Sequence, residues 1–374
     1  MTRSAPPLLI AACWAIGGSS ASAQQVLEID YESGRTIIDD PWRAIAGGSV
    51  IDHGAGVLYV LDAEEPEGVM AFSLETGEWI RTIMTPTGDG PQELPEGVES
   101  MSVASDGRLY VSGLLRILEF GPQGNYLGHW TPNLAPRLEG AVCDFGGRPA
   151  VPTRNGVVRR SEDGPDEAIG ENVELLSGDP DDWEKTDESF DEFWRVQSAR
   201  ILCTPNAAYV VTQYGGVSTY REVSEGVARP DSLADFYYRS NREGRLPIPA
   251  GLAADQALTV GPLLESDNRG NLVLLGISLV TLVGQEGGFW NMGAVIDPVN
   301  GCHAVIRNPE RNMLQPRLMG IYQDSAVVGY RYREETTENG RRVITNHSYA
   351  NKVALHLLRR LSGEPCAGML PSVS

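Results

Sequence analysis

The chain has 374 residues, among them 42 Gly and 24 Pro, and few long helical patterns, a combination that favours an all-β fold with many turns. Its formal net charge of −20 disfavours nucleic acid as a partner, because binding to phosphates requires a basic face. The length is enough for one large domain or two ordinary ones.

Residues 1–23 have the layout of a secretory signal peptide. Arg3 supplies the positive charge, an apolar stretch follows, and Ala21-Ser22-Ala23 forms an A-x-A cleavage site that would leave Gln24 as the first mature residue. The apolar stretch is too short to span a bilayer, so we expect export to the periplasm or the cell exterior. The alternative is a lipid anchor at Cys13, which lies in a sequence resembling a lipobox.

The longest apolar stretch beyond the signal peptide is Leu272–Val283. It is interrupted by Gly276 and Ser278, and it is shorter than the roughly 20 residues that a membrane helix needs. We interpret it as two buried strands around a bend, which leaves no predicted membrane span.

A unit of some fifty residues is repeated near the N-terminus. Gly56–Asp62 resembles Gly107–Gly113, each a short alternating strand opened by a glycine turn, and each has an inner strand before it and two more strands after it. The predicted strands are Ala44–Asp52, Gly56–Asp62, Val69–Leu74 and Glu78–Ile83, then Val98–Ser105, Gly107–Gly113, Arg116–Phe120 and Tyr126–Trp130. Four short antiparallel strands per unit are typical of a propeller blade.

Four further units follow with more drift. Their inner strands are predicted at Ala141–Cys143, Ile201–Cys203, Leu263–Ser266 and Leu318–Tyr322. The last unit is one strand short, and Val26–Ile29 is a free strand whose pairing with that unit would close the ring and remove an exposed edge. We therefore predict one all-β domain over residues 24–374, a six-bladed β-propeller of four-stranded antiparallel blades.

Residues 88–94 read Gly-Asp-Gly-Pro-Gln-Glu-Leu. This stretch is similar to the G-x-G-P-x-E-[FL] segment that links one blade to the next in six-bladed β-propellers related to NHL-repeat proteins. The first two units, residues 44–130, resemble that family well. The resemblance implies the fold and little about function.

The same segment supplies the first candidate ligand contacts, Gln92 and Glu93. Its backbone N–H groups could cradle a ligand. In the alternative interpretation, the glycines and Pro91 make a tight crossing between blades, and Glu93 caps a neighbouring turn.

The most unusual segment is 161–194, which holds fourteen acidic residues and one lysine. Interleaved aromatic side chains are unexpected in a purely solvated tail. We predict ligand contacts at Trp183, Phe193 and Trp194, and calcium ligands, the weaker prediction, at Asp179, Asp181 and Asp187. Alternatively, this is an acidic excursion whose aromatic side chains pack on the face of the propeller.

Four cysteines remain after loss of the signal peptide. An even number in an exported chain predicts two disulfides, with three possible pairings. Cys143 and Cys203 take nearly the same phase of successive units, so the favoured pairings are Cys143–Cys203 and Cys302–Cys366.

The sequence contains no G-x-S-x-G, H-E-x-x-H or P-loop motif, and its five histidines are dispersed over different units and strand phases. We expect a monomeric, non-enzymatic binding or scaffold propeller, with calcium as the one cofactor candidate. Its protein, small-molecule or glycan ligand would lie on the face that carries the blade-to-blade loops and segment 161–194. The alternative is a metal-dependent lactonase- or lyase-type propeller with calcium or zinc in its channel. A third hypothesis is that segment 161–194 captures a basic protein partner.

Overall fold

The computed structural model describes most of the chain beyond the predicted signal peptide. The described residues are 24–63, 68–95, 97–113, 116–132, 142–153, 156–170, 198–203, 207–214, 217–224, 227–230, 257–259, 263–266, 272–280, 289–296, 303–309, 316–338 and 341–363.

Nearly all the regular structure in these residues is β-strand, in consecutive antiparallel groups. The first two groups are β3 (Ile45–Asp52), β4 (Val57–Asp62), β5 (Gly68–Ser73) and β6 (Trp79–Met84), then β7 (Ser100–Val103), β8 (Leu109–Ser112), β9 (Ile117–Phe120) and β10 (Tyr126–Trp130). The third and fourth groups are β11 (Cys143–Asp144), β12 (Pro149–Pro152), β13 (Gly156–Arg159) and β14 (Glu167–Gly170), then β15 (Ser198–Cys203), β16 (Ala207–Tyr214), β17 (Val217–Ser224) and β18 (Val227–Pro230).

The remaining strands come from both ends of the chain. They are β19 (Ala257–Thr259), β20 (Leu263–Ser266), β21 (Leu272–Val280), β22 (Phe289–Ile296), β23 (His303–Asn308), β24 (Pro316–Tyr322), β25 (Ser325–Glu338) and β26 (Arg341–Ser362), with β1 (Gln24–Ile29) and β2 (Arg35–Asp39) from the N-terminal end. Within them the order of pairing is β20-β21-β22-β23 and β24-β25-β26-β2.

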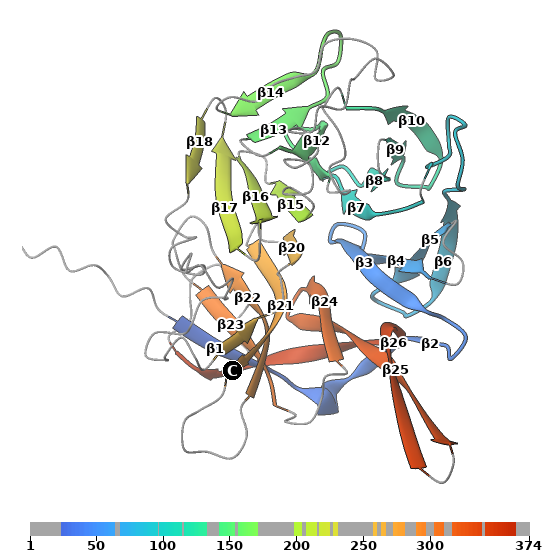
Figure 1. Cartoon of the computed structure of the whole chain (residues 1–374), viewed down its shortest axis with the longest axis vertical. Coiled ribbons are helices and arrows are strands. Elements are labelled where there is room, and N and C mark those ends of the chain that lie inside the picture. Colours follow the sequence, from blue (N-terminus) through green and yellow to red (C-terminus); the bar gives the residue numbers. More distant parts are fainter. Residues whose placement is uncertain are drawn as a thin grey trace, which may run out of the picture.

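The sheets are arranged around a common middle with their first strands innermost (Figure 1). Strand β3 contacts β7, β7 contacts β11, β11 contacts β15, β15 contacts β20, and β24 contacts β3. The predicted all-β fold of several four-stranded antiparallel sheets is confirmed. All eight strands predicted for the first two units are present, within two residues of the expected bounds.

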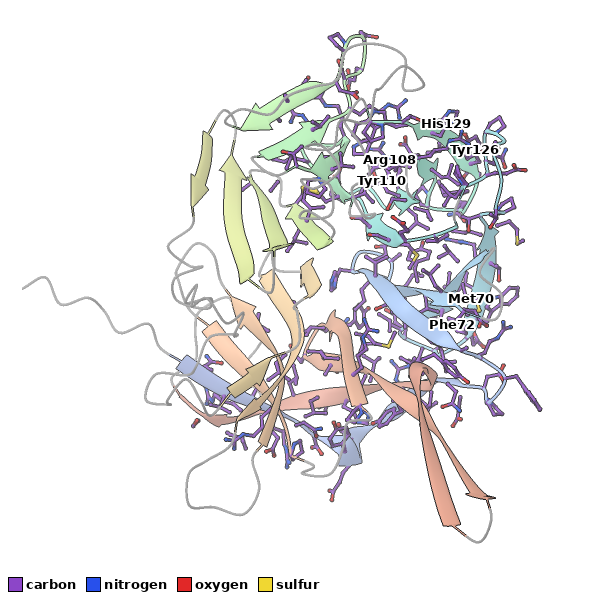
Figure 2. All side chains as sticks on the ribbon, in the orientation of Figure 1. Met70, Phe72, Arg108, Tyr110, Tyr126 and His129 are labelled. Atoms are coloured by element: carbon purple, nitrogen blue, oxygen red, sulfur yellow. A yellow bond between two sulfur atoms is a disulfide. The ribbon has the colours of Figure 1, made fainter. Side chains whose placement is uncertain are left out.

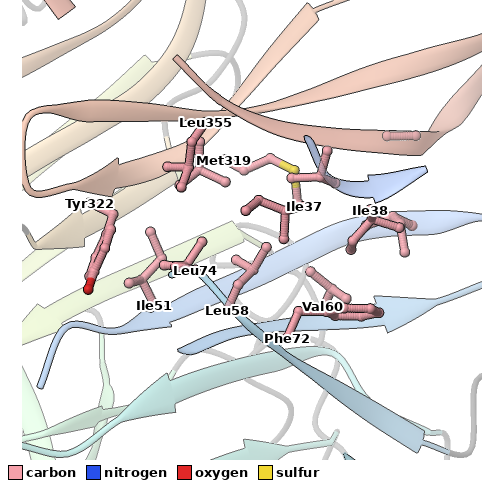
Figure 3. Close-up of a cluster of buried hydrophobic side chains, with 14 of the residues drawn as sticks. Ile37, Ile38, Ile51, Leu58, Val60, Phe72, Leu74, Met319, Tyr322 and Leu355 are labelled. Carbon is pink, nitrogen blue, oxygen red and sulfur yellow. The ribbon is translucent and has the colours of Figure 1, made fainter. Parts of the chain in front are cut away.

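The hydrophobic core lies in layers between neighbouring sheets. Strand β4 alternates between two of these layers: Leu58 and Val60 pack against β2, β24 and β26, whereas Tyr59 and Leu61 pack against the second sheet. Figure 3 shows the first of these layers, where Ile37 and Leu58 lie in one cluster with Met319 and Leu355. Because side chains alternate along a strand, a strand covered on both faces is apolar over most of its length, and every residue of β4 is buried.

The N-terminal residues pair with the last strand in a different way from the predicted one. Strand β1 pairs antiparallel with β26 at Leu358–Ser362 and parallel with β23, so it lies between two groups. The strand that takes the fourth position beside β24, β25 and β26 is β2, paired with residues 352–355. The prediction assigned this position to Val26–Ile29, the free strand at the start of the mature chain.

Strand β2 repeats a contact made by β6, the outer strand of the first sheet. Arg35-Thr36-Ile37 has the same sequence as Arg81-Thr82-Ile83. Arg35 donates to the backbone carbonyls of Leu74 and Glu75 in the next sheet, and Arg81 donates to the carbonyl of Pro122 in the sheet after that. The turn glycines packed beneath, Gly77 and Gly124, have φ of +80° and +81°. Residues 35–37 are thus equivalent to an outer strand.

A buried aromatic cluster holds the N-terminal segment against the last strands. His356 is 4% exposed, and its Nε2 lies 2.5 Å from the hydroxyl of Tyr330. The ring of Tyr31, in the 3-10 helix Tyr31–Ser33, meets the His356 ring edge-on at 5.0 Å and donates its hydroxyl proton to Asn308 at 3.0 Å. Burial lowers the pKa of His356, outweighing the nearby charge of Asp30.

The predicted disulfide Cys143–Cys203 is confirmed, with its Cα atoms 5.6 Å apart. It joins the first strands of the third and fourth sheets, β11 and β15. Cys302 and Cys366 lie outside the described residues.

The prediction of two strands in Leu272–Val283 is wrong. Strand β21 runs unbroken to Val280, with a bulge between Leu275 and Ser278 in its pairing with β22. The bulge absorbs Gly276, which had suggested a bend. Among the described residues, no helix is long and apolar enough to cross a membrane.

Replacing Ile37 by alanine should lower the free energy of unfolding by about 2–5 kcal/mol, because the side chain is 5% exposed in the layer between β2 and the first sheet. The matched control is Ile80→Ala on β6, which is 39% exposed and should cost no more than about 0.5 kcal/mol. Urea denaturation measures both. Equal effects of the two substitutions would contradict the placement of β2.

The stability that His356 contributes should depend on pH. Its pKa in the folded protein is below the unfolded value of about 6.5, so the unfolded state binds more protons as the pH falls. The difference in unfolding free energy between the wild type and His356→Gln should be constant above about pH 7 and shrink below pH 6.5. Urea denaturation at pH 7.5, 6.0 and 5.0 checks this. A difference that stays constant or grows on acidification would contradict the burial of a neutral imidazole.

Candidate ligand-binding face

In a four-stranded antiparallel sheet, the loop to the next sheet and the turn between the second and third strands lie at the same end. We call this end of the fold the loop face, and the opposite end, with the other turns, the turn face. The loop face includes two loops between sheets that the structure describes almost completely. One is the turn Asp40–Arg43 between β2 and β3, and the other is residues 85–99 between β6 and β7, where residue 96 is not described.

In the crossing Gly88–Leu94, several backbone and side-chain polar groups form hydrogen bonds within the loop itself. The carboxylate of Glu93 accepts the backbone N–H of Gly90 at 2.7 Å, and the backbone N–H of Glu93 returns to the carbonyl of Gly90 at 3.0 Å. Leu94 is fully buried, and its N–H donates to the carbonyl of Pro86. Glu93 therefore caps a turn in its own loop, while Gln92 is exposed. Their role in ligand binding stays a prediction.

Arg116 fixes this crossing from the second sheet. Its guanidinium donates to three carbonyls of the loop, those of Asp89 at 3.3 Å, Gly90 at 2.5 Å and Glu93 at 3.0 Å. A guanidinium carries five donors in a fixed plane, so one side chain can hold several carbonyls at once. The loop is thereby anchored to the strand that begins at Ile117.

A second side-chain brace comes from Tyr126 on β10. Its hydroxyl lies 2.6 Å from the carbonyl of Pro91 and 2.9 Å from Nδ1 of His129. Figure 2 labels Tyr126 and His129. The carbonyl can only accept, so the hydroxyl proton goes to Pro91, and Nδ1 of His129 must donate to the hydroxyl oxygen. This hydrogen-bond assignment leaves Nε2 of a neutral His129 as an acceptor on an exposed side chain.

The turn Asp40–Arg43 is also fixed by side chains. Asp40 accepts the N–H of Trp42 on its carboxylate at 3.0 Å and the N–H of Arg43 on its carbonyl at 3.1 Å. The guanidinium of Arg43 pairs at 2.9 Å with Asp62, whose side chain is only 1% exposed. Trp42 itself is 87% exposed.

The turn face carries a different polar cluster, centred on Arg108 (Figure 2). Its guanidinium donates to Asp106 at 2.7 Å, to Glu119 at 2.5 Å and to the carbonyl of Gly147 in the third sheet at 2.9 Å. Glu119 also pairs with Arg160 of the third sheet at 3.2 Å. The contacts with Gly147 and Arg160 hold the second and third sheets together.

Tyr110 and Asp144 lie beside this cluster. Burial raises the pKa of both side chains, and the charge of Asp144 adds to the effect on Tyr110. The Tyr110 hydroxyl and Oδ1 of Asp144 are buried without a hydrogen-bond partner in the part of the chain that the structure describes, whereas Oδ2 of Asp144 is 3.4 Å from the N–H and hydroxyl of Ser105. Buried polar atoms of this kind are ordinarily bridged by ordered water.

The other predicted site residues lie outside the part of the chain that the structure describes. They are the ligand contacts Trp183, Phe193 and Trp194 and the calcium ligands Asp179, Asp181 and Asp187. Within the described ranges, no group of three or more His, Cys, Asp or Glu side chains is placed to hold a metal ion.

Trp42, Arg43 and Arg116 are not among the predicted site residues. Asp40-Pro41-Trp42-Arg43 has the residues of a turn opened by aspartate and proline, which would have indicated that the tryptophan is presented at a bend. No sequence signal marks Arg116, because its three partners are backbone carbonyls more than twenty residues away.

Replacing Arg116 by methionine, which keeps the apolar stem, should loosen the crossing. We expect amide hydrogen exchange of Gly90 and Leu94 to rise about tenfold or more, equivalent to ~1.4 kcal/mol of local stability, because the three carbonyls lose a charged donor. The matched control is Arg108→Met at the turn face, which should leave the exchange of these amides unchanged. Unchanged exchange in Arg116→Met would contradict the bracing of the loop.

Comparison with known proteins gives structural similarities alone. No family model matches the sequence, and no curated protein is similar to it. The similar solved structures include that of U3-55K, with 12% identity, coverage of 88% of this chain and 99% of that one, and a TM-score of 0.43. A candidate exported protein of Bacteroides fragilis has 9% identity, coverage of 91% and 100%, and a TM-score of 0.43. A candidate gluconolactonase has 12% identity, coverage of 88% and 92%, and a TM-score of 0.43. These similarities are to β-propeller proteins, and what those proteins bind or catalyse is stated of them alone.

Proposed function

We propose that this chain is an exported, monomeric, non-enzymatic six-bladed β-propeller that binds a ligand on its loop face. The fold would be of the type related to NHL-repeat proteins, with the N-terminal strands completing the last blade.

Three observations support six blades in a closed ring. Of the 26 described strands, 24 fall into six groups of four if β2 is counted with β24, β25 and β26, and β1 and β19 pair at the edges of these groups. The first strands contact one another from β3 through β20, and β24 contacts both β21 and β3. The third observation is the Arg-Thr-Ile sequence shared by β2 and β6, since it gives the N-terminal segment the contacts of an outer strand.

Export is supported by the layout of residues 1–23 and by the disulfide Cys143–Cys203. Disulfides form and persist in the periplasm and outside the cell, whereas cytoplasmic thiols are kept reduced.

The observation that carries the binding function is the bracing of both described crossings by arginine. Arg43 is held by a buried carboxylate, and Arg116 spans three carbonyls of the next crossing. Loops that are fixed before a ligand arrives lose little conformational entropy on binding, and binding residues are concentrated on loops that a rigid scaffold positions. At the turn face, by contrast, the polar groups of Arg108 and Glu119 join neighbouring sheets.

The test uses the mature chain, residues 24–374, purified from the periplasm. We expect no stoichiometric metal after dialysis against EDTA, no hydrolysis of γ- and δ-lactones with added calcium or zinc, and a single monomer in light scattering. Incubation with the soluble envelope fraction of the producing cells should slow amide exchange at residues 40–44 and 86–94, and Arg116→Met should weaken the protection at the second loop. Metal-dependent lactone turnover, or protection confined to the turn face, would overturn the proposal.

A further inference from the structure

The turn between β2 and β3 presents one large aromatic side chain to solvent. Trp42 is 87% exposed, more than any other exposed large hydrophobic residue among those described. The next in rank, Trp79 and Met84, are both 59% exposed and lie on the outer strand β6. Tryptophan is highly buried on average in folded proteins, and an indole exposed to this extent has almost its whole surface free for contact with a ligand.

The backbone under Trp42 is rigid. Pro41 has a fixed φ, and Asp40 accepts both following N–H groups, so the four residues form one hydrogen-bonded turn. The N–H of Asp40 donates to the carbonyl of Asn351 at 3.1 Å, which ties the turn to β26. The backbone of Trp42 is therefore fixed by hydrogen bonds of the residues on both sides of it.

The far side of the turn is anchored as firmly. The carboxylate of Asp62, at the end of β4, accepts the guanidinium of Arg43 at 2.9 Å and the N–H of Ala44 at 3.2 Å. Asp62 is almost completely buried, and truncating one partner of such a pair is costly. The turn is thus anchored to β26 at one end and to β4 at the other.

The turn is flanked by exposed charged side chains that can form hydrogen bonds with the hydroxyl groups of a sugar. Asp39 and Lys352 form an ion pair at 3.7 Å, with side chains 65% and 43% exposed, and Arg43 is 31% exposed. The other exposed large hydrophobic residues lie on β6, β10 and the end of β26, not in this turn. The core of a protein–protein interface is depleted of charge and has several apolar residues together, whereas this surface has one aromatic ring among charges.

A pyranose has the complementary surface. One face of the ring carries axial C–H groups, which are attracted to the electron-rich face of an indole, and its rim carries hydroxyls that hydrogen-bond to carboxylate and ammonium groups. We propose that Trp42 is the stacking platform of a carbohydrate-binding site on the loop face, with the exposed Asp39 and Lys352 as hydrogen-bonding partners. This inference rests on the proposed function and names its ligand class.

The experiment is affinity electrophoresis of the mature chain in native gels that contain dextran, laminarin, galactomannan or arabinoxylan. At least one of these neutral polysaccharides should retard the wild type, and titration calorimetry with its oligosaccharide then gives the affinity. Trp42→Ala should weaken binding about tenfold or more, whereas Trp42→Phe, which keeps an aromatic face, should stay within about threefold. Trp79→Ala removes an exposed tryptophan from β6 and should bind as the wild type does.

Two controls keep the result interpretable. Trp42→Ala should unfold at the same urea concentration as the wild type, because a largely exposed side chain contributes little to stability. Raising NaCl from 50 to 500 mM should leave the affinity unchanged, since stacking and neutral hydroxyls are not screened. Binding to polylysine that disappears at 500 mM NaCl, with no polysaccharide retarding the protein, would identify a cationic partner and overturn the proposal.

Failure of this inference is distinguishable from failure of the proposed function. A polysaccharide that Trp42→Ala binds as tightly as the wild type, but that Arg116→Met binds more weakly, would remove Trp42 from the site and leave ligand binding on the loop face in place. No retardation by any of the four polysaccharides would overturn the carbohydrate inference, and the proposed function would fall only with metal-dependent turnover or with protection at the turn face.

Discussion

The rest of the fold depends on the antiparallel pairing of β2 with β26. This pairing joins residues 35–39 to residues 352–355, more than three hundred positions apart, and it inserts Ile37 and Ile38 into the layer that covers Leu58 and Val60. A sheet of three strands would leave the edge of β26 open at this place, and an open edge is a template for pairing with another chain. The arginine of β2 then extends the contact onto the next sheet, so one short strand connects the two ends of the chain to the first repeat.

The same strand leads directly into the loop face. Four residues after Ile38, the chain presents Trp42 on a turn whose ends are the paired strand β2 and the buried strand β3. The geometry of that turn is therefore determined by the packing of the sheets on either side, and Asp62 and Asn351 belong to those sheets. The crossing at residues 88–94 follows the same logic with different side chains, because Arg116 and Tyr126 hold it from the second sheet. The two faces differ in what their charged groups do, since at the turn face Arg108 and Glu119 bind the second sheet to the third.

The local repeats made much of this fold predictable. Gly56–Asp62 and Gly107–Gly113 carry alternation, a glycine turn and the Leu-Tyr-Val sequence together, so strand bounds were correct to within two residues. Phase in the repeat also gave the pairing of Cys143 with Cys203. The N-terminal segment was harder, because both of its strands pair with β26, and a free strand in the sequence does not say which of them takes the fourth position beside residues 352–355. The shared Arg-Thr-Ile was the signal for β2. The bracing of the loops was beyond sequence reasoning, since the contacts of Arg116 are with backbone atoms and the exposure of Trp42 depends on strands that border it.

Native-state hydrogen exchange tests the central claim most directly, by comparing the amides of residues 35–39 and 352–355 with those of β4. If β2 is an integral strand that completes the last sheet, its paired amides and those of β26 should exchange only through the global unfolding that also exposes β4, with the same dependence on denaturant. Amides of residues 35–39 that exchange at the rate of a free peptide, while those of β4 remain protected, would contradict it.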